Sequence, residues 1–247
     1  GSAGSGGIGD FLASIYGDET GSIPESGKYL HVFSLLESAF PPWFNLWSDK
    51  DAVSKQVVGF RCGSLKFTID GKEGQIPVEV EGISKSESNL SSQTLTFSDK
   101  QIVIPSNATT VKLGGSTVDL ESIEITIERE QEGINTVGTS RDISTLISGK
   151  TFKISFALSG LAFSNETERT KFKNVGSSSL ELKIEDDAGW YLHFDFPEIY
   201  YTAFEGPSIS DTDVLRVSLN GMVTGEDHSI SLLNDYQYKY TDGTLIS

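Results

Sequence analysis

Apolar and polar residues alternate along most of this chain with a period of two residues. That period is typical of β-strands that bury one face and expose the other. Because each row has a single apolar face, the pattern favours antiparallel sheets that pack on one side, and it predicts a mainly β fold. The clearest rows have as their apolar members Leu65, Phe67 and Ile69; Ile76, Val78 and Val80; Ile123, Ile125 and Ile127; Phe152, Ile154, Phe156 and Leu158; Leu180, Leu182 and Ile184; Leu192, Phe194 and Phe196; and Leu215, Val217 and Leu219.

Helical signals are few. A short amphipathic piece covers Asp10–Tyr16, and a second helix is expected over Glu166–Asn174, with acidic residues in its first turn and lysines near its end. A third is expected over Pro41–Asp49, where Trp43, Phe44 and Trp47 would share one helical face and lie on the sheet.

Two stretches begin alike, at residues 26–28 and at residues 148–150, where both read Ser-Gly-Lys. The offset of 122 residues (148 − 26) is about half of the 247-residue chain. An internal repeat of this size predicts one domain used twice. We expect domains at 1–90 and 91–247, joined by a polar, serine-rich linker at Ser84–Gln93.

The segment Glu128–Ile147 reads as an irregular loop of about twenty residues between two strong strands. Loops of this length are uncommon in compact domains unless they have a function. We therefore expect a protruding arm that contacts a neighbouring subunit. The alternative is a flexible insertion.

Composition narrows the possible partners. The chain has 19 basic and 35 acidic residues and a net charge of −16. Such a surface repels nucleic acid and anionic membranes. No apolar run is long enough to cross a bilayer. The N-terminal residues GSAGSGGIGD lack the basic start and apolar stretch of a secretion signal.

Residues that would carry catalysis or bind a cofactor or metal are scattered. The single Cys62 alternates with apolar neighbours, so we expect a buried, inert thiol. His31 and His193 fall at polar positions of strand rows, and with His228 they show no metal-ligand spacing. The acidic turns Glu185–Asp187 and Asp211–Asp213 favour solvated carboxylates over a Ca²⁺ site. We expect no enzymatic activity, no cofactor and no metal.

The order of segments in the second half resembles the tail tube (major tail) proteins of long-tailed phages and related archaeal viruses. The resemblance begins with LESIEITIEREQEGINTVGTSRDISTLISGKTFKISFALSG, residues 120–160, and continues with the helix NETERTKFKNV and the strand LELKIED. It ends with YLHFDFPEIYYTAFEGPSISDTDVLRVSLNGMV, residues 191–223. The first half, including FRCGSLKFTIDGKEGQIPVEVEGIS, resembles the trimmed leading domain of a two-domain subset of this family.

The resemblance implies two tandem tail-tube-type β-sandwich or barrel domains, each with a short helix packed on its sheet, that assemble into a ring. Three subunits, each with two fused domains and so with pseudo-sixfold symmetry, or else six subunits, would close the ring. Stacked rings would form the virion tail tube, made in the host cytoplasm, through which viral DNA passes without specific binding. The implied partners are further copies of the chain and the tape measure, tail terminator and distal tail proteins, with no membrane partner.

The resemblance also suggests roles for particular residues. An acidic bore would repel the phosphate backbone, so that the genome slides through. The candidates for the bore are Glu79, Glu81, Glu124 and Asp195, and those for the inter-ring arm are Glu132, Asn135, Thr136, Arg141 and Asp142.

The alternative function is a two-domain β-sandwich adhesin or carbohydrate-binding module, which the aromatic residues around Trp190 would serve.

Overall fold

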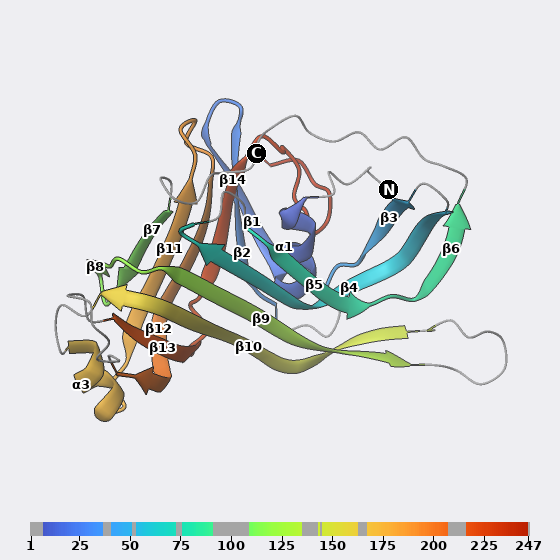
Figure 1. Cartoon of the computed structure of the whole chain (residues 1–247). Coiled ribbons are helices and arrows are strands. Elements are labelled where there is room, and N and C mark those ends of the chain that lie inside the picture. The colour runs from blue at the N-terminus through green and yellow to red at the C-terminus, as the bar shows by residue number, and fades with distance from the viewer. Residues whose placement is uncertain are drawn as a thin grey trace.

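The computed structural model describes residues 7–36, 41–50, 53–72, 76–90, 109–134, 143, 145–162, 167–206 and 216–246, and their fold is mainly β (Figure 1). The helices are α1 (Ile8–Tyr16) and α3 (Thr167–Lys173). The strands are β1 (Gly17–Glu25), β2 (Lys28–Leu35), β3 (Phe44–Lys50), β4 (Val53–Asp70), β5 (Val78–Ile83), β6 (Ser86–Leu90), β7 (Thr109–Leu113), β8 (Ser116–Thr117), β9 (Ser122–Ile134), β10 (Thr145–Ala162), β11 (Ser178–Glu185), β12 (Tyr191–Glu205), β13 (Arg216–Val223) and β14 (Ser229–Asn234).

The strands form one continuous sheet that folds over on itself. Its order is β1-β2-β14-β12-β13-β10-β9-β4-β3; β5 and β6 pair with β4, and β11 joins β12 to β7. Figure 1 shows β11, β12 and β14 standing upright beside the long β9–β10 hairpin, which runs along the lower side. Phe67 of β4 meets Phe194 of β12 edge to face, with ring centroids 5.0 Å apart, and both side chains are buried. The two parts of the sheet therefore pack across a common core as a sandwich.

The alternating rows predict this core well. Leu65, Ile125, Ile154, Leu182 and Phe194 are each at most 2% exposed, and each represents one predicted row. The row around Val78 is the exception. It shares the apolar face of the sheet as expected, but Val78 is 39% exposed because β5 lies at the edge of the sheet.

Two of the three predicted helices are confirmed. The piece expected at Asp10–Tyr16 is α1, whose residues Leu12 and Ile15 are fully buried. It ends at Gly17, whose φ of +92° is a left-handed conformation that glycine adopts readily. The helix expected at Glu166–Asn174 is α3.

The helix predicted at Pro41–Asp49 is wrong. Phe44–Lys50 is strand β3, which pairs antiparallel with β4. The ring of Phe44 packs edge to face on Phe11 of α1 and Phe60 of β4. Hydrogen bonding to β4 and this aromatic contact override a residue spacing that also fits a helical face.

The predicted linker is also wrong in part, because Ser86–Leu90 forms strand β6 and pairs with β4; its end, residues 91–93, lies outside the described residues. Strands from both sides of residue 90 pair with each other: Leu65 of β4 lies opposite Ile127 of β9, and Phe33 of β2 lies opposite Ile230 of β14. The division into domains 1–90 and 91–247 stays a prediction.

His31 stands at a polar position of its strand row, and the structure shows it as a packed, fully buried histidine rather than a solvent-facing one. Its Nδ1 lies 2.7 Å from Glu19 Oε1, and its Nε2 lies 2.9 Å from the carbonyl oxygen of Tyr236. The other oxygen of the Glu19 carboxylate accepts a hydrogen bond from the backbone N–H of Thr241. This network fixes the segment that follows β14 to the β1–β2 hairpin.

The other two histidines are packed structural residues. His193 Nε2 lies 3.2 Å from Glu181 Oε1 on the neighbouring strand. His228 is buried and stacks on Phe152, with ring centroids 5.3 Å apart. Cys62 is fully buried, as predicted, and burial raises the pKa of its thiol to about 12.

Candidate functional site

Six glutamates form a row on the outer face of β5 and β9. Lys66 of β4 lies between buried Leu65 and Phe67, so its own side chain points outward. Residues directly opposite each other on paired strands share a face, and Lys66 pairs with Glu79 of β5 and with Thr126 of β9. By this register and alternation the same outer face carries Glu79, Glu81, Glu124, Glu128, Glu130 and Glu132, which we call the acidic strip.

Two lysines on this face partly neutralise the acidic strip. Lys66 Nζ lies 2.9 Å from Glu124 Oε2, and Lys153 Nζ lies 3.8 Å from Glu128 Oε2. The bond to Glu124, with the charges of Glu124 and Glu79, raises the pKa of Lys66. Glu79, Glu81, Glu130 and Glu132 are all exposed. The face therefore keeps an excess of negative charge.

Asp195 lies on the opposite outer face. It stands on β12 between buried Phe194 and Phe196, and Phe194 contacts Phe67 across the core. Its side chain is exposed and points away from that core. Of the four residues predicted to line a bore, Glu79, Glu81 and Glu124 therefore lie on the acidic strip. Asp195 lies on the other side of the sandwich.

Both described ends of the segment expected to be an irregular arm are paired strands. Residues 122–134 and 145–162 are strands β9 and β10, so the prediction of an irregular loop is wrong at both ends of Glu128–Ile147. We call residues 130–134 and 145–148 the arm stem, in which 131–134 pair with 145–148. Of the predicted arm residues, Glu132 is an exposed member of the stem. The others, Asn135, Thr136, Arg141 and Asp142, lie outside the described residues.

Two buried arginines attach the stem to the body. Arg129, the residue before the stem, donates from Nη1 to the carbonyls of Ile15 and Tyr16 at the end of α1 and from Nη2 to that of Leu36. Burial and then the nearby charge of Arg61 lower the pKa of Arg129.

Arg61 donates to the carbonyl oxygen of Leu146 on the other strand of the stem. A register shift between Ser148 and Phe152 separates the stem from the rest of β10. The arginines thus fix the direction in which the hairpin leaves the body.

The sheet also has open edges within the described part of the chain. There, β5 pairs with β4 and β1 pairs with β2, and the far side of each of these strands meets no other described strand. Val78 on β5 and Ile23 on β1 are 39% and 46% exposed. Open edges with exposed apolar side chains are sites where another chain can add a strand.

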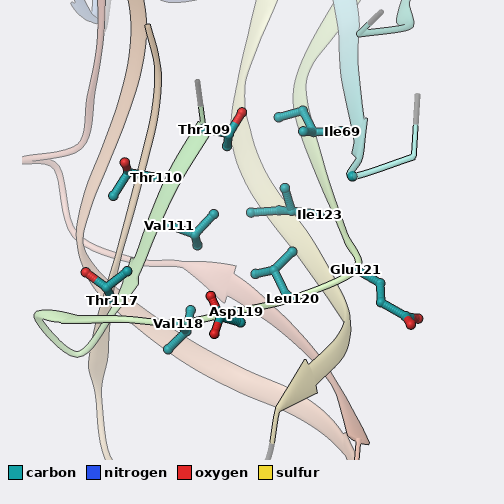
Figure 2. Close-up of a pocket in the computed structure, with 11 residues that line it drawn as sticks. Ile69, Thr109, Thr110, Val111, Thr117, Val118, Asp119, Leu120, Glu121 and Ile123 are labelled. Carbon is teal, nitrogen blue, oxygen red and sulfur yellow. The ribbon is translucent and has the colours of Figure 1, made fainter. Parts of the chain in front are cut away.

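A small pocket of about 260 Å³ opens between β7 and the start of β9 (Figure 2). Ile69, Leu120 and Ile123 make much of its wall, and Figure 2 shows Glu121 pointing away from them. Among the described residues no group of three or more His, Cys, Asp or Glu side chains could hold a metal ion. Thr109, Thr110, Thr117 and Asp119 also line the pocket, so its wall is a mixture of apolar and polar side chains.

Reasoning from the sequence missed the arginine anchor and the division of the acidic residues between two faces. Arg129 continues the buried row of Ile123, Ile125 and Ile127, and Arg61 is in phase with Leu65 and Phe67, which was a usable signal. The carbonyl partners of Arg129 on Ile15 and Leu36 are about a hundred residues away in the sequence, so no local pattern indicated these contacts.

A mainly β sandwich with open edges, a projecting hairpin and a row of outward carboxylates is typical of structural subunits that self-assemble. The chain belongs to the phage tail tube protein family, whose model matches residues 2–223. Membership gives the chain a structural role in the virion tail, and it implies self-assembly into a tube and association with other tail proteins.

The match ends at the end of β13, so β14 and the segment after it lie beyond the matched residues. No curated protein matches the chain. Neither described helix has the length and apolar character needed to span a membrane.

Proposed function

We propose that this protein forms stacked rings that make the tail tube, and that viral DNA reaches the host cell through their bore. The observation that carries the proposal is the family match over residues 2–223, in a fold whose described strands leave open edges. Three subunits with pseudo-sixfold symmetry, or six, close each ring. The tube meets the tape measure, tail terminator and distal tail proteins in the virion, and no step involves catalysis.

Ring closure uses the open edge of β5. Val80 and Val78 of β5 lie beside Leu65 and Phe67 of β4, so the apolar face of the sheet continues past the last buried row. Leu65 and Phe67 are at most 1% exposed, whereas Val78 is 39% exposed. A strand from a neighbouring copy would pair with β5 and cover this row, which removes apolar surface from water and satisfies the free backbone groups.

The part of the acidic strip outside the arm stem, Glu79, Glu81, Glu124 and Glu128, lines the bore. DNA carries about one negative charge per 1.7 Å of helix axis, so a wall with excess carboxylates repels it and binds it weakly. Glu79 and Glu81 on β5 are the most suitable members because both are exposed on the edge strand. Asp195 faces away from the strip, so we assign it to the outer side of the tube.

Electron microscopy of the purified protein tests the main proposal. Rings or tubes with a central channel are expected at high protein concentration. Discrete particles without a channel, under conditions where the protein stays folded, would refute it. The adhesin alternative gains nothing from the fold, since Trp190 is partly buried and Lys28 Nζ lies over its ring, 5.5 Å from the centroid.

Removing the arm tests its role between rings. Gln131 and Ser148 pair in register, so a variant without Glu132–Ser144 would join them through the three residues 145–147, a length common in β-hairpins. We expect a folded, soluble protein that forms no long tubes. Tubes of normal length from this variant would end the arm hypothesis.

Charge reversal on β5 tests the bore. Because Glu79 and Glu81 are exposed, replacing both with lysine should change the folding free energy by less than about 1 kcal/mol in all. Tubes of the variant are expected to retain short duplex DNA at low salt, whereas wild-type tubes do not. Asp195→Lys is the matched control on the other face. If it retains DNA in the channel and the β5 variant does not, the assignment of the faces is reversed.

A further inference from the structure

The end of helix α3 has an unusual residue at a defined position. The N–H of Gly176 donates to the carbonyl of Lys171 at 2.8 Å, and the N–H of Val175 donates to that of Phe172 at 3.3 Å. These two bonds make a Schellman motif, in which the residue after the helix cap is left-handed. That residue is Val175, with a φ of +53°. Glycine is usual there, and a β-branched side chain in this conformation is strained.

Burial within the described part of the chain does not explain a valine at this position. Val175 is 77% exposed, the largest fraction among the exposed large apolar residues that the structure describes. The helix that carries it is well fixed, since Phe172 stacks on Phe204 of β12 with centroids 5.9 Å apart. Lys171 Nζ bonds both Glu168 and Ser178 at 2.9 Å. A strained residue held outward on a fixed support is typical of a contact site.

The arm stem offers a matching surface. Ile134 at its end is 39% exposed, and Glu130 and Glu132 beside it are exposed. At α3, the exposed apolar residue Val175 follows exposed Lys173 by two positions. One surface is therefore apolar and acidic, and the other is apolar and basic, in a chain whose net charge is −16.

The two surfaces lie at opposite ends of the subunit. The stem is at the start of the 18-residue strand β10, and α3 follows the end of that strand. Figure 1 shows α3 near one end of the paired strands β9 and β10 and the arm stem at their other end. Strands rise about 3.3 Å per residue, so the two surfaces are some tens of ångströms apart. Complementary surfaces at opposite ends of one subunit make head-to-tail contacts between copies.

We propose that the end of α3, Lys173–Gly176, in one copy receives the arm stem of another copy. Val175 packs on Ile134, and Lys173 pairs with Glu132. This inference rests on the proposed tube assembly, and it names the surface to which the arm binds.

Substitution of Val175 separates a docking role from a folding role. Asparagine tolerates the left-handed conformation, so Val175→Asn relieves strain and removes the apolar contact. We expect the melting temperature of the unassembled protein to rise by about 2–8 °C. The protein concentration needed for tube formation should rise about tenfold or more, as for loss of a central interface contact. A residue with only a structural role would not stabilise the folded subunit and at the same time weaken its assembly.

Charge reversal identifies the partner surface. Lys173→Glu and Glu132→Lys should each weaken assembly, and the two changes together should restore much of it. Lys55→Glu, at a lysine on β4 that is 55% exposed, is the control and should assemble as the wild type does.

The docking alone would be overturned if Val175→Asn formed tubes at the concentration at which the wild-type protein does. It would also be overturned if the double charge reversal assembled no better than the single changes. A wild-type protein that forms neither rings nor tubes would overturn both the docking and the proposed function.

Discussion

The assignment of the two outer faces depends on the contact between Phe67 and Phe194. Phe67 stands on β4 and Phe194 on β12, and their rings meet at an interplanar angle of 78°. If these strands pack across the core, Lys66 and Asp195 must point to opposite sides. We therefore predict a measurable energetic coupling between the two rings.

The magnitude follows from burial and ring geometry. Phe67 is 1% exposed and Phe194 is fully buried. Replacing either ring with leucine removes the equivalent of two or three methylene groups, which should cost about 1.6–2.4 kcal/mol in folding free energy. Either change also removes the edge-to-face interaction, worth about 0.5–1.5 kcal/mol, so the double variant should lose less than the sum of the two by that amount.

Urea unfolding of the unassembled protein measures this coupling. With a denaturant slope of about 3 kcal/mol/M, a coupling of 1 kcal/mol corresponds to about 0.3 M in the unfolding midpoint. Phe67→Leu combined with Phe33→Leu is the control, because Phe33 packs on Tyr240 elsewhere in the core, and these two changes should add. If Phe67 and Phe194 add just as simply, β4 and β12 do not pack across the core, and the placement of the acidic strip and Asp195 on opposite faces is refuted.

Three further outcomes are expected from single sites. Arg129→Lys keeps the charge but loses the three hydrogen bonds from the guanidinium. It should cost about 2–4 kcal/mol of folding free energy and speed amide exchange in α1 and the arm stem. Unchanged exchange there would argue against the anchor. Burial lowers the pKa of His228, and a backbone hydrogen bond and the charge of Asp227 oppose this shift only in part. The unfolded state therefore binds a proton more readily than the folded state does. The free energy of unfolding should fall as the pH drops below about 6.5. His228→Phe should lose that part of the acid dependence, and identical pH profiles in urea would contradict this. The thiol of Cys62, with its pKa raised to about 12, should resist alkylation at pH 8 in the folded protein and react at once in urea, whereas rapid reaction of the folded protein would contradict its burial.

The alternating rows were sufficient to predict the strands and most of the core, because a strand with one buried face has a local signature. Ile123, Ile125 and Ile127 illustrate this, since each is at most 1% exposed. The same signature did not distinguish strand from helix at Trp43, Phe44 and Trp47. Their spacing fits one helical face, and only the pairing of β3 with β4 decides the conformation.

Long-range partners explain the other differences. His31 occupies a polar position in its strand row, yet its partners on the C-terminal side, Asn234 and Tyr236, are 203 and 205 residues away. No local pattern could predict that the segment after β14 folds back over it. The acidic residues were candidates because of the family resemblance and their polar positions in strand rows, whereas their division between two faces needed the register of β4 with β5 and β9.

The place of β14 in the sheet bears on when a subunit can be completed during synthesis. β14 lies between β2 and β12, so the β1–β2 hairpin joins the rest of the sheet through residues 229–234. A ribosome that has made only the first two hundred residues therefore holds a nascent chain whose earliest strands still lack their neighbour. Pairing across so many residues is slow to form, which favours release of the finished polypeptide before it joins a growing polymer.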